Sequence, residues 1–412
     1  MGILFSENKK EFSKKRILII GAGWEQVPLI KKAKEMGLYV VATHPDETGD
    51  GLSFADEKEI VNPRDLPKIL DIAKKHKIDA ATADECDYSY FASVFVANNL
   101  GLPGTKIDTA QLSTNKKRVR IKCQEYGILQ PTFYPCVALK EVKEAVGKIG
   151  FPIIMKPLDN RGNFGVNQVL ESSEIEPAFY EAIANSHSRE ILVEKFIEGT
   201  MIMIDGYVFD NLGHIPLAIS SKKMLGGRKR VAMDIIYPAQ IPEQFLKKAL
   251  ETTNQIANKA LKLERGATHT EFILDKKGDI YLIEIHNRGG GVFISNKIVP
   301  AVSGVDVSEC LIRHALGEKV TLGKEPDILT KFALLKFFRF SPGKVKKILD
   351  IEKSKKTLGL LEMRLSIKEG DIIKEITNDA NRHGFTITVG DSADEVYKIS
   401  NQAISRIKII YD

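Results

Sequence analysis

Residues 269–291 read HTEFILDKKGDIYLIEIHNRGGG. Two apolar runs of strand type flank the tight-turn sequence KKGD, so the sequence predicts a β-hairpin. Glu271 and Glu284 interrupt the two runs at positions where a sheet normally keeps an aliphatic side chain. Because a buried carboxylate is costly unless it is paired or binds a metal, the hairpin predicts a Mg²⁺ site, with a structural ion-pair network as the alternative. Arg288 and the glycines after it add a fork-shaped cation and free backbone N–H groups, which suit an anion.

Two other segments carry groups that suit a nucleotide. In FPIIMKPLDNRGNFGV, residues 151–166, a strand delivers Lys156 and a polar loop follows, punctuated by Gly162 and Gly165. A lysine beside mobile backbone N–H groups suits a phosphate chain, and a surface hairpin is an equally good interpretation of this segment alone. In ILVEKFIEGT, residues 191–200, a flat base could bond to the backbone, although an edge strand is the commoner explanation of such a run.

The N-terminal part alternates strands and helices. Residues 16–104 read as βαβαβα, which predicts a parallel sheet covered on both faces. The first turn, GAGWEQ, supplies Gly21 and Gly23 of a dinucleotide fingerprint, but Gln26 stands where the third glycine is needed. A plain βα turn is therefore favoured, and an NAD(P)-dependent oxidoreductase is a minor alternative. From about residue 328 the pattern changes to antiparallel strands and a closing helix.

Composition argues against several classes of function. The chain has 412 residues and a net charge of +6, but its basic residues are spread among nearly as many acids, so no nucleic-acid surface is predicted. No run approaches the ~20 apolar residues of a membrane span, and the Lys-rich start does not resemble a signal peptide. The four cysteines lie far apart in the sequence, which indicates reduced thiols and a cytoplasmic protein.

In this order, the motifs resemble the ATP-grasp superfamily over nearly all of the chain. The resemblance implies a mixed α/β and α+β ATP-grasp fold with a Rossmann-like preATP-grasp domain over residues 1–115, an ATP-grasp domain over residues 116–327, and an antiparallel α+β domain over residues 328–412. The ATP-grasp domain would have a flexible small lobe at about 138–200 and a larger lobe at about 201–327. SPGKV and the tail RHGFTITVGDSADEVYKISNQA resemble the C-terminal domain of L-amino-acid ligases and their relatives.

The same resemblance assigns roles to individual residues. Lys156 and Arg288 are expected to act on the transferred phosphate, and the carboxylate of Glu194 is expected to face the base. ATP is expected at Lys116, Lys156, Gly162, Asn163, Gly165, Glu194, Lys195 and Ile197. Mg²⁺ is expected at Glu271, Glu284 and His286. The substrates are expected at Trp24, Glu25, Gln26, Glu85, His269, Arg288 and Gly290.

Two residues depart from the pattern of the superfamily. Met201 replaces the acid that usually contacts the ribose hydroxyls. His286 replaces the asparagine that usually binds the metal, and on an alternating strand it shares a face with Glu284. An imidazole suits Mg²⁺ less well than an oxygen ligand does, so the alternatives are Mn²⁺, Asn287 in a shifted register, or a substrate role for His286.

The resemblance implies an ATP-dependent carboxylate–amine ligase that forms an amide or peptide-like bond through an acyl phosphate and releases ADP and phosphate. Its partners would be ATP and small carboxylate and amine substrates, with a homodimer as one option for assembly. A purine-pathway or biotin-carboxylase-like enzyme acting on formate or bicarbonate is the alternative, and a nucleotide-binding protein without catalysis is a further one. The basic run SSKKMLGGRKR, residues 220–230, is either a lid over an acidic substrate or a solvated loop.

Overall fold

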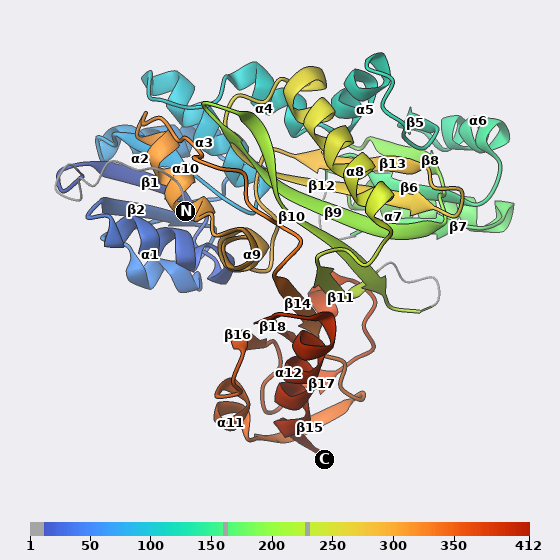
Figure 1. Ribbon diagram of the computed structural model, residues 1–412. Coiled ribbons are helices and arrows are strands. Elements are labelled where there is room, and N and C mark those ends of the chain that lie inside the picture. Colours follow the sequence, from blue (N-terminus) through green and yellow to red (C-terminus); the bar gives the residue numbers. More distant parts are fainter. Residues whose placement is uncertain (1–11, 160–163, 227–230) are drawn as a thin grey trace.

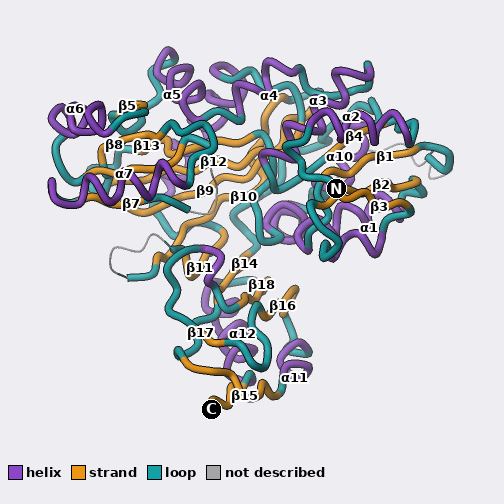
Figure 2. The backbone as a smooth tube through the Cα atoms, turned by 180° about the vertical axis from the view of Figure 1, so that it is seen from behind, coloured by secondary structure: helices purple, strands orange, loops and turns teal. Residues whose placement is uncertain are grey.

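The computed structural model describes residues 12–159, 164–226 and 231–412. Figure 1 shows the N-terminal part in blue beside the long central strands, and the C-terminal part in red projecting below them. Seen from behind in Figure 2, the same three parts keep this arrangement, with the N-terminal strands β1 to β3 on the opposite side of the view. None of the described helices is long and apolar enough to cross a membrane.

The N-terminal part is a parallel sheet, as the βα alternation predicts. Its strand order is β3-β2-β1-β4, and all neighbouring strands pair in parallel. Ile17 of β1 packs against α1, whereas Leu18 packs against α2 and α3, so both faces of the sheet are covered. The elements are β1 (Arg16–Ile20), α1 (Val27–Glu35), β2 (Tyr39–His44), β3 (Glu57–Ile60), α2 (Leu66–Lys75), β4 (Ala80–Thr82) and α3 (Asp87–Leu100). The sequence pattern does not predict β3, because this edge strand is charged and mostly exposed.

One face of the N-terminal sheet is covered by a helix from much later in the chain. This helix, α10 (Val307–Ala315), contributes Ile312 and Ala315 to the core that α1 and β1 share. Asp306 at the start of α10 also pairs with Lys32 of α1, with 2.8 Å between Oδ2 and Nζ. The N-terminal and central parts therefore share one core.

Two antiparallel sheets form the central part. The smaller sheet has the strand order β5-β8-β6-β7 and packs against α6 and α7. Its elements are β5 (Phe133–Cys136), α6 (Leu139–Ile149), β6 (Ile153–Pro157), β7 (Asn167–Val169), α7 (Ile175–Ala184) and β8 (Ile191–Lys195). Two helices lie between the N-terminal sheet and this one in sequence, α4 (Ile107–Ser113) and α5 (Lys116–Glu125).

The larger sheet has eight strands in the order β13-β12-β9-β10-β11-β14-β18-β16. Strands β12 and β13 pair antiparallel, which confirms the predicted hairpin. The central elements are β9 (Gly199–Phe209), β10 (Gly213–Met224), β11 (Ala232–Tyr237), α8 (Glu243–Gln255), β12 (Gly266–Asp275) and β13 (Ile280–His286).

The C-terminal part continues this larger sheet. Strand β14 pairs with β11, and β18 and β16 follow it, so three strands of the C-terminal part are hydrogen-bonded into the central sheet. A separate three-stranded sheet, in the order β17-β15-β19, lies at the far end. The elements are β14 (Phe332–Phe337), β15 (Gly343–Leu349), α11 (Ile351–Lys355), β16 (Leu360–Leu365), β17 (Ile372–Ile373), β18 (Gly384–Gly390), α12 (Ala393–Arg406) and β19 (Lys408–Tyr411).

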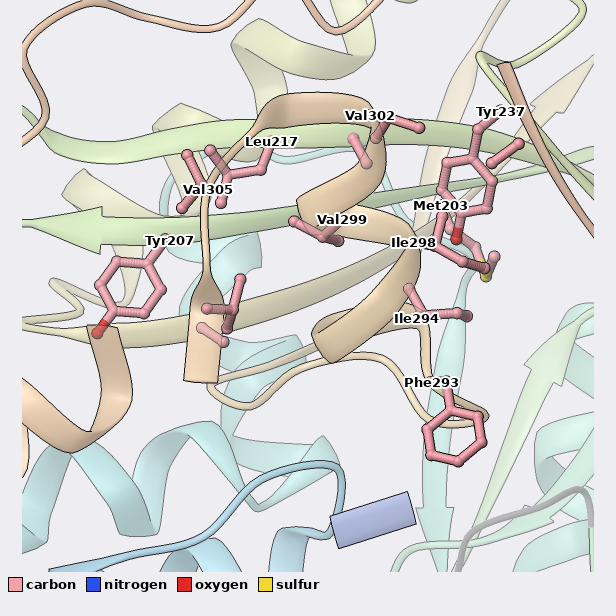
Figure 3. Packing of buried hydrophobic residues seen from close by; sticks show 14 of the residues in the cluster. Met203, Tyr207, Leu217, Tyr237, Phe293, Ile294, Ile298, Val299, Val302 and Val305 are labelled. Atoms are coloured by element: carbon pink, nitrogen blue, oxygen red, sulfur yellow. The ribbon is translucent and has the colours of Figure 1, made fainter. Parts of the chain in front are cut away.

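A buried cluster holds the segment after β13 against the larger sheet (Figure 3). Met203 and Tyr207 of β9 and Leu217 of β10 pack against apolar side chains of the turn that runs into α9 (Val299–Ser303). The side chains of that segment in the cluster are Phe293, Ile294, Ile298, Val299 and Val302. Because this segment directly follows Arg288 and the glycine run, the cluster fixes the backbone at one wall of the candidate site.

We expect Ile298→Ala to lower the free energy of unfolding by about 2–5 kcal/mol, because Ile298 is 0% exposed and its truncation leaves a cavity. Denaturant unfolding followed by circular dichroism measures this change. The matched control is Ile410→Ala on β19, where the side chain is 43% exposed and the expected change stays within about 0.5 kcal/mol. Equal changes in the two variants would contradict the assignment of Ile298 to the core.

Candidate active site

Several predicted site residues meet where the N-terminal and central parts of the chain come together. A cavity of about 500 Å³ opens there, lined by the start of α3, the turn between α4 and α5, the first turns of α5, and β13. Its charged lining includes Lys116, Glu284 and His286, which the sequence predicts, and Asp87 and Arg120, which it does not.

Glu271 on β12 and Glu284 on β13 lie directly opposite each other across the hairpin. Each largely buried carboxylate contacts a lysine: Lys222 Nζ is 2.5 Å from Glu271 Oε1, and Lys116 Nζ is 3.7 Å from Glu284 Oε2. Burial opposes ionisation of both acids, but Lys222 lowers the pKa of Glu271, and His286 with Lys116 lowers the pKa of Glu284. Both acids are therefore ionised and face cations, so their donor oxygens suit Mg²⁺.

His286 lies between Glu284 and an acid of the N-terminal part. Its Nδ1 is 2.9 Å from Asp87 Oδ1, and its buried Nε2 is 3.4 Å from Glu284 Oε1 without forming a hydrogen bond. The described residues contain no group of three His, Cys, Asp or Glu side chains already arranged as a metal site. In this structure, lysines and His286 occupy the positions around the two glutamates.

Asp87, at the start of α3, also holds Arg288. Its Oδ2 is 3.3 Å from Arg288 Nη2. Burial opposes the charge on Asp87, but Arg288 and His286 outweigh it and hold the pKa of this carboxyl below its usual value. The sequence signal for Asp87 is its place just after the carboxyl end of β4, where open parallel sheets present residues to ligands.

The side-chain amide of Asn287 forms hydrogen bonds within the protein. Its Nδ2 donates to the carbonyl oxygens of Arg265 and Ala267 at 3.1 and 3.0 Å, and its Oδ1 accepts from the hydroxyl of Tyr90 at 2.6 Å. This buried amide ties β12 to α3. The contacts argue against the shifted register in which Asn287 would bind the metal in place of His286.

Lys156, at the end of β6, contacts Glu194 of β8. Lys156 Nζ is 2.7 Å from Glu194 Oε2, and Arg120 Nη2 is 2.5 Å from Glu194 Oε1. The carboxylate of Glu194, which the resemblance places toward the base, therefore contacts two cations in this structure. The backbone N–H of Lys195 donates to the carbonyl oxygen of Thr132 at 2.8 Å, and neither Lys195 nor Ile197 lines the cavity.

Four predicted substrate residues gather around the glycine run after Arg288. Glu25 Oε1 accepts from the backbone N–H of Val292 at 2.6 Å. Glu85 Oε1 accepts from Asn296 Nδ2 at 2.7 Å, while its buried Oε2 has no hydrogen-bond partner. Burial, with the nearby carboxylates of Glu25 and Asp84, raises the pKa of Glu85 well above its usual value.

His269 and Gly290 complete this group. His269 Nδ1 is 2.7 Å from Asp205 Oδ1, and its Nε2 is 3.6 Å from Glu271 Oε1. Burial would lower the pKa of His269, but Asp205 outweighs it and the pKa rises to about 9. A β-carbon at Gly290 would lie 2.8 Å from Asp205 Oδ1 and 3.0 Å from His269 Nδ1, so this position requires glycine.

Two predicted substrate residues have structural contacts instead. The ring of Trp24 lies edge-on to Phe293, with 5.0 Å between centroids, beside Phe385 and beneath the guanidinium of Arg364. Gln26 is buried, where its Oε1 accepts from the backbone N–H of Gly23 at 3.1 Å and its Nε2 donates to the Asp84 carbonyl oxygen at 3.5 Å. Trp24 therefore packs beside the segment that follows the glycine run, and neither residue lines the cavity.

Several predicted residues lie outside the part of the chain that the structure describes. These are Gly162 and Asn163 of the phosphate loop and Arg228 and Arg230 of the basic run. Gly165 is described and has a φ of +72°, a conformation that favours glycine. Met201 lies on β9 opposite Ile273 of β12, and its side chain offers no acid to a ribose.

Comparison with known proteins agrees with this architecture. Residues 149–296 match the ATP-grasp domain family, and residues 336–412 match the L-amino acid ligase C-terminal domain 2 family. Formate-dependent phosphoribosylglycinamide formyltransferase of Bacteroides fragilis is 26% identical over 282 residues, which cover 66% of this chain and 70% of that protein.

Solved structures share the whole fold. L-amino acid ligase from Bacillus licheniformis aligns with a TM-score of 0.82 at 22% identity, over 97% of this chain and 99% of that one. The biotin carboxylase domain of Hydrogenobacter thermophilus 2-oxoglutarate carboxylase, solved with MgADP, ADP and bicarbonate, aligns with a TM-score of 0.76 at 18% identity, over 96% of this chain and 90% of that one. The family matches therefore give this chain an ATP-grasp domain, followed by a C-terminal part that matches that of the L-amino acid ligases.

Proposed function

We propose that this protein is an ATP-dependent carboxylate–amine ligase. The observation that carries the proposal is the set of lysine–carboxylate contacts around one site: Lys116 with Glu284, Lys222 with Glu271, and Lys156 with Glu194. Buried ion pairs of this kind are weak contributors to stability, so their clustering favours a functional role. A phosphate chain can replace the acids as the partner of the lysines, and a metal ion can replace the lysines as the partner of Glu271 and Glu284.

The described residues suit distinct parts of the nucleotide. Lys116 and Lys156 would hold the phosphates, and Glu271 and Glu284 would hold Mg²⁺, which would supply charge neutralisation for the phosphates. Nε2 of His286, which forms no hydrogen bond in the structure, is a further ligand candidate, and because it is a nitrogen it also suits Mn²⁺.

Arg288 would compensate charge on the transferred phosphate, and its contact with Asp87, which also contacts His286, supports this role. An oxygen of the substrate carboxylate would attack the γ-phosphorus, and the bond from that phosphorus to ADP would break. The amine would then attack the acyl carbon and lose a proton, and phosphate would leave with the former carboxylate oxygen. These steps need no nucleophile from the protein.

The substrates would lie at the glycine run, near Glu85 and His269. The buried Oε2 of Glu85 has no partner in the structure and is surrounded by further carboxylates, so it suits an amino or ammonium group. The imidazole of His269, with its pKa raised to about 9, carries a positive charge and suits a carboxylate or phosphate oxygen. Together, Glu85 and His269 favour substrates that carry an amino group and also a carboxylate or phosphate group.

A second candidate function is compatible with the same fold but has a different acid as its substrate. The relative from Bacteroides fragilis is named for dependence on formate, which makes an enzyme that activates formate or bicarbonate the alternative. The match of residues 336–412 to the L-amino acid ligase C-terminal family supports the first proposal over this one.

We expect ADP release from ATP to depend on a carboxylate and an amine together. A panel of acid and amine pairs, assayed for ADP and phosphate with Mg²⁺ and with Mn²⁺, measures this dependence. Mass spectrometry of the active pairs should find the amide. Turnover with formate or bicarbonate, but with none of the amino acids in the panel, would favour an enzyme that activates formate or bicarbonate.

We expect Glu284→Gln to reduce this ADP release by about 100-fold or more, because the amide removes the charge that balances the metal and Lys116. The matched control is Glu198→Gln, which neutralises an exposed acid paired with Lys276 at 3.3 Å and should keep the wild-type rate. Full activity in Glu284→Gln would contradict the proposed role of the hairpin.

A further inference from the structure

One end of the cavity carries an imidazole between two acids from different parts of the chain. His286 of β13 lines the cavity together with Glu284 of the same strand and Asp87 of α3. Glu284 and His286 are two residues apart, so their side chains lie on the same face of the sheet. Nε2 of His286 is buried, forms no hydrogen bond and is 3.4 Å from Glu284 Oε1. The cavity therefore places a ring nitrogen beside a carboxylate that is proposed to bind Mg²⁺.

Asp87 contacts the other nitrogen of the same ring. Its Oδ1 is 2.9 Å from His286 Nδ1. An ionised carboxylate can only accept a hydrogen bond, so Nδ1 is the nitrogen that donates. The hydrogen bond made by one ring nitrogen sets which of the two can bind a metal, and a carboxylate on Nδ1 leaves Nε2 for that role. Asp87 therefore favours the form of His286 in which Nε2 is a metal ligand.

Two further contacts hold Asp87 in place against the end of β13. Its Oδ2 is 3.3 Å from Arg288 Nη2, so the carboxylate contacts residues on both sides of Asn287. The hydroxyl of Tyr90, also on α3, donates to Asn287 Oδ1 at 2.6 Å. Helix α3 and the strand end are therefore tied at three consecutive residues of the strand, and the direction of the His286 ring is set before any ion binds.

A second imidazole lies near the two glutamates, but not in the cavity. His269 of β12 lies opposite His286 across the hairpin. Its Nδ1 is 2.7 Å from Asp205 Oδ1, and its Nε2 is 3.6 Å from Glu271 Oε1. His269 does not line the cavity, whereas His286 does. His286 is therefore the imidazole that an ion in the cavity would meet beside Glu284.

We infer that Asp87 is a positioning residue that holds His286 with Nε2 toward Glu284, and that it thereby raises the preference of the metal site for Mn²⁺ over Mg²⁺. This inference rests on the proposed function. Mg²⁺ demands near-ideal octahedral geometry and is bound through oxygen atoms, so a nitrogen ligand suits Mn²⁺ better. An acid of the N-terminal part would then set the metal preference of ligands that all lie on the β12–β13 hairpin.

The first test identifies the ligand atom by pulsed electron paramagnetic resonance of Mn²⁺ bound to the intact chain with ADP. A nitrogen bound to Mn²⁺ gives a hyperfine coupling that oxygen ligands do not give. Wild type should show this coupling, and labelling the histidine rings with another nitrogen isotope should change it. His286→Asn should abolish it. A histidine coupling that persists in His286→Asn would assign the nitrogen to another histidine and overturn the inference.

The second test measures the affinities of Mn²⁺ and of Mg²⁺ for the complex of the chain with ADP, by calorimetric titration. ADP binds the two ions unequally by itself, but this contribution is the same in every variant, so the ratio of the two affinities is compared with that of wild type. His286→Asn and Asp87→Asn should each lower the Mn²⁺ to Mg²⁺ ratio by about tenfold. The matched control is Asp46→Asn, which removes a 59% exposed acid beside another imidazole, that of His44, and should keep the wild-type ratio.

A double-mutant cycle separates positioning from a general structural effect. If Asp87 acts through the imidazole, Asp87→Asn should leave the ratio unchanged when it is added to His286→Asn. A disturbed Arg288 or a loosened fold weakens the binding of both ions together and does not move the ratio. Thermal unfolding checks that each variant folds. If Asp87→Asn does not fold, Asp87→Glu decides, because its carboxylate is displaced by one methylene group and should also lower the ratio.

The outcomes for this inference and for the proposed function differ. An unchanged ratio in folded His286→Asn or in the folded Asp87 variant would overturn the inference and leave the ligase proposal standing. A further drop in the ratio on adding Asp87→Asn to His286→Asn would also overturn it, because Asp87 would then act by another route. A wild type that binds neither ADP nor a divalent ion would overturn both.

Discussion

Glu271 and Glu284 lie largely buried and opposite each other in an antiparallel hairpin, and the site is arranged around the need to neutralise them. Removing an ion from water costs several kcal/mol, and two like charges at this spacing also repel each other. The compensating cations come from separate elements, Lys222 from β10 and Lys116 from α5. The hairpin, β10 and α5 must therefore converge on the two carboxylates, and Glu284 and the first turns of α5 also line the cavity.

The N-terminal part completes this charge balance. Asp87 at the start of α3 contacts both His286 and Arg288, so the residues at the end of β13 are oriented by an acid from a different sheet. The hydrogen bond between Tyr90 and Asn287 ties the same helix to the same strand end. These contacts make the N-terminal sheet part of the site, and the core it shares with α10 keeps it in place.

The C-terminal part is joined to the site through the larger sheet and through an aromatic contact. Strands β14, β18 and β16 extend the sheet that carries the hairpin. Trp24 from the N-terminal part packs between Phe293, which follows the glycine run, and Phe385 of β18. All three parts of the chain thus contact the segment after Arg288, the segment proposed to face the substrates.

Local patterns in the sequence were enough to predict several secondary-structure elements of this protein. Alternation of apolar runs and helices predicted the parallel N-terminal sheet, and KKGD between two apolar runs predicted the hairpin that carries Glu271 and Glu284. These features depend on neighbours within a few residues, so periodicity and turn chemistry suffice to find them. The exposed strand β3 and the continuation of one sheet into the C-terminal part do not depend on such neighbours, and only the structure revealed them.

The partners of the site residues were decided by the tertiary structure alone. Asp87 and His286 lie 199 positions apart, and Arg120 and Glu194 lie 74 positions apart. Nothing local to Arg120 distinguishes it from the other basic residues of α5, because burial and the direction of a side chain follow from how helices and sheets pack. The sequence determined which charged groups are present, and the fold decided which of them face each other without water between them.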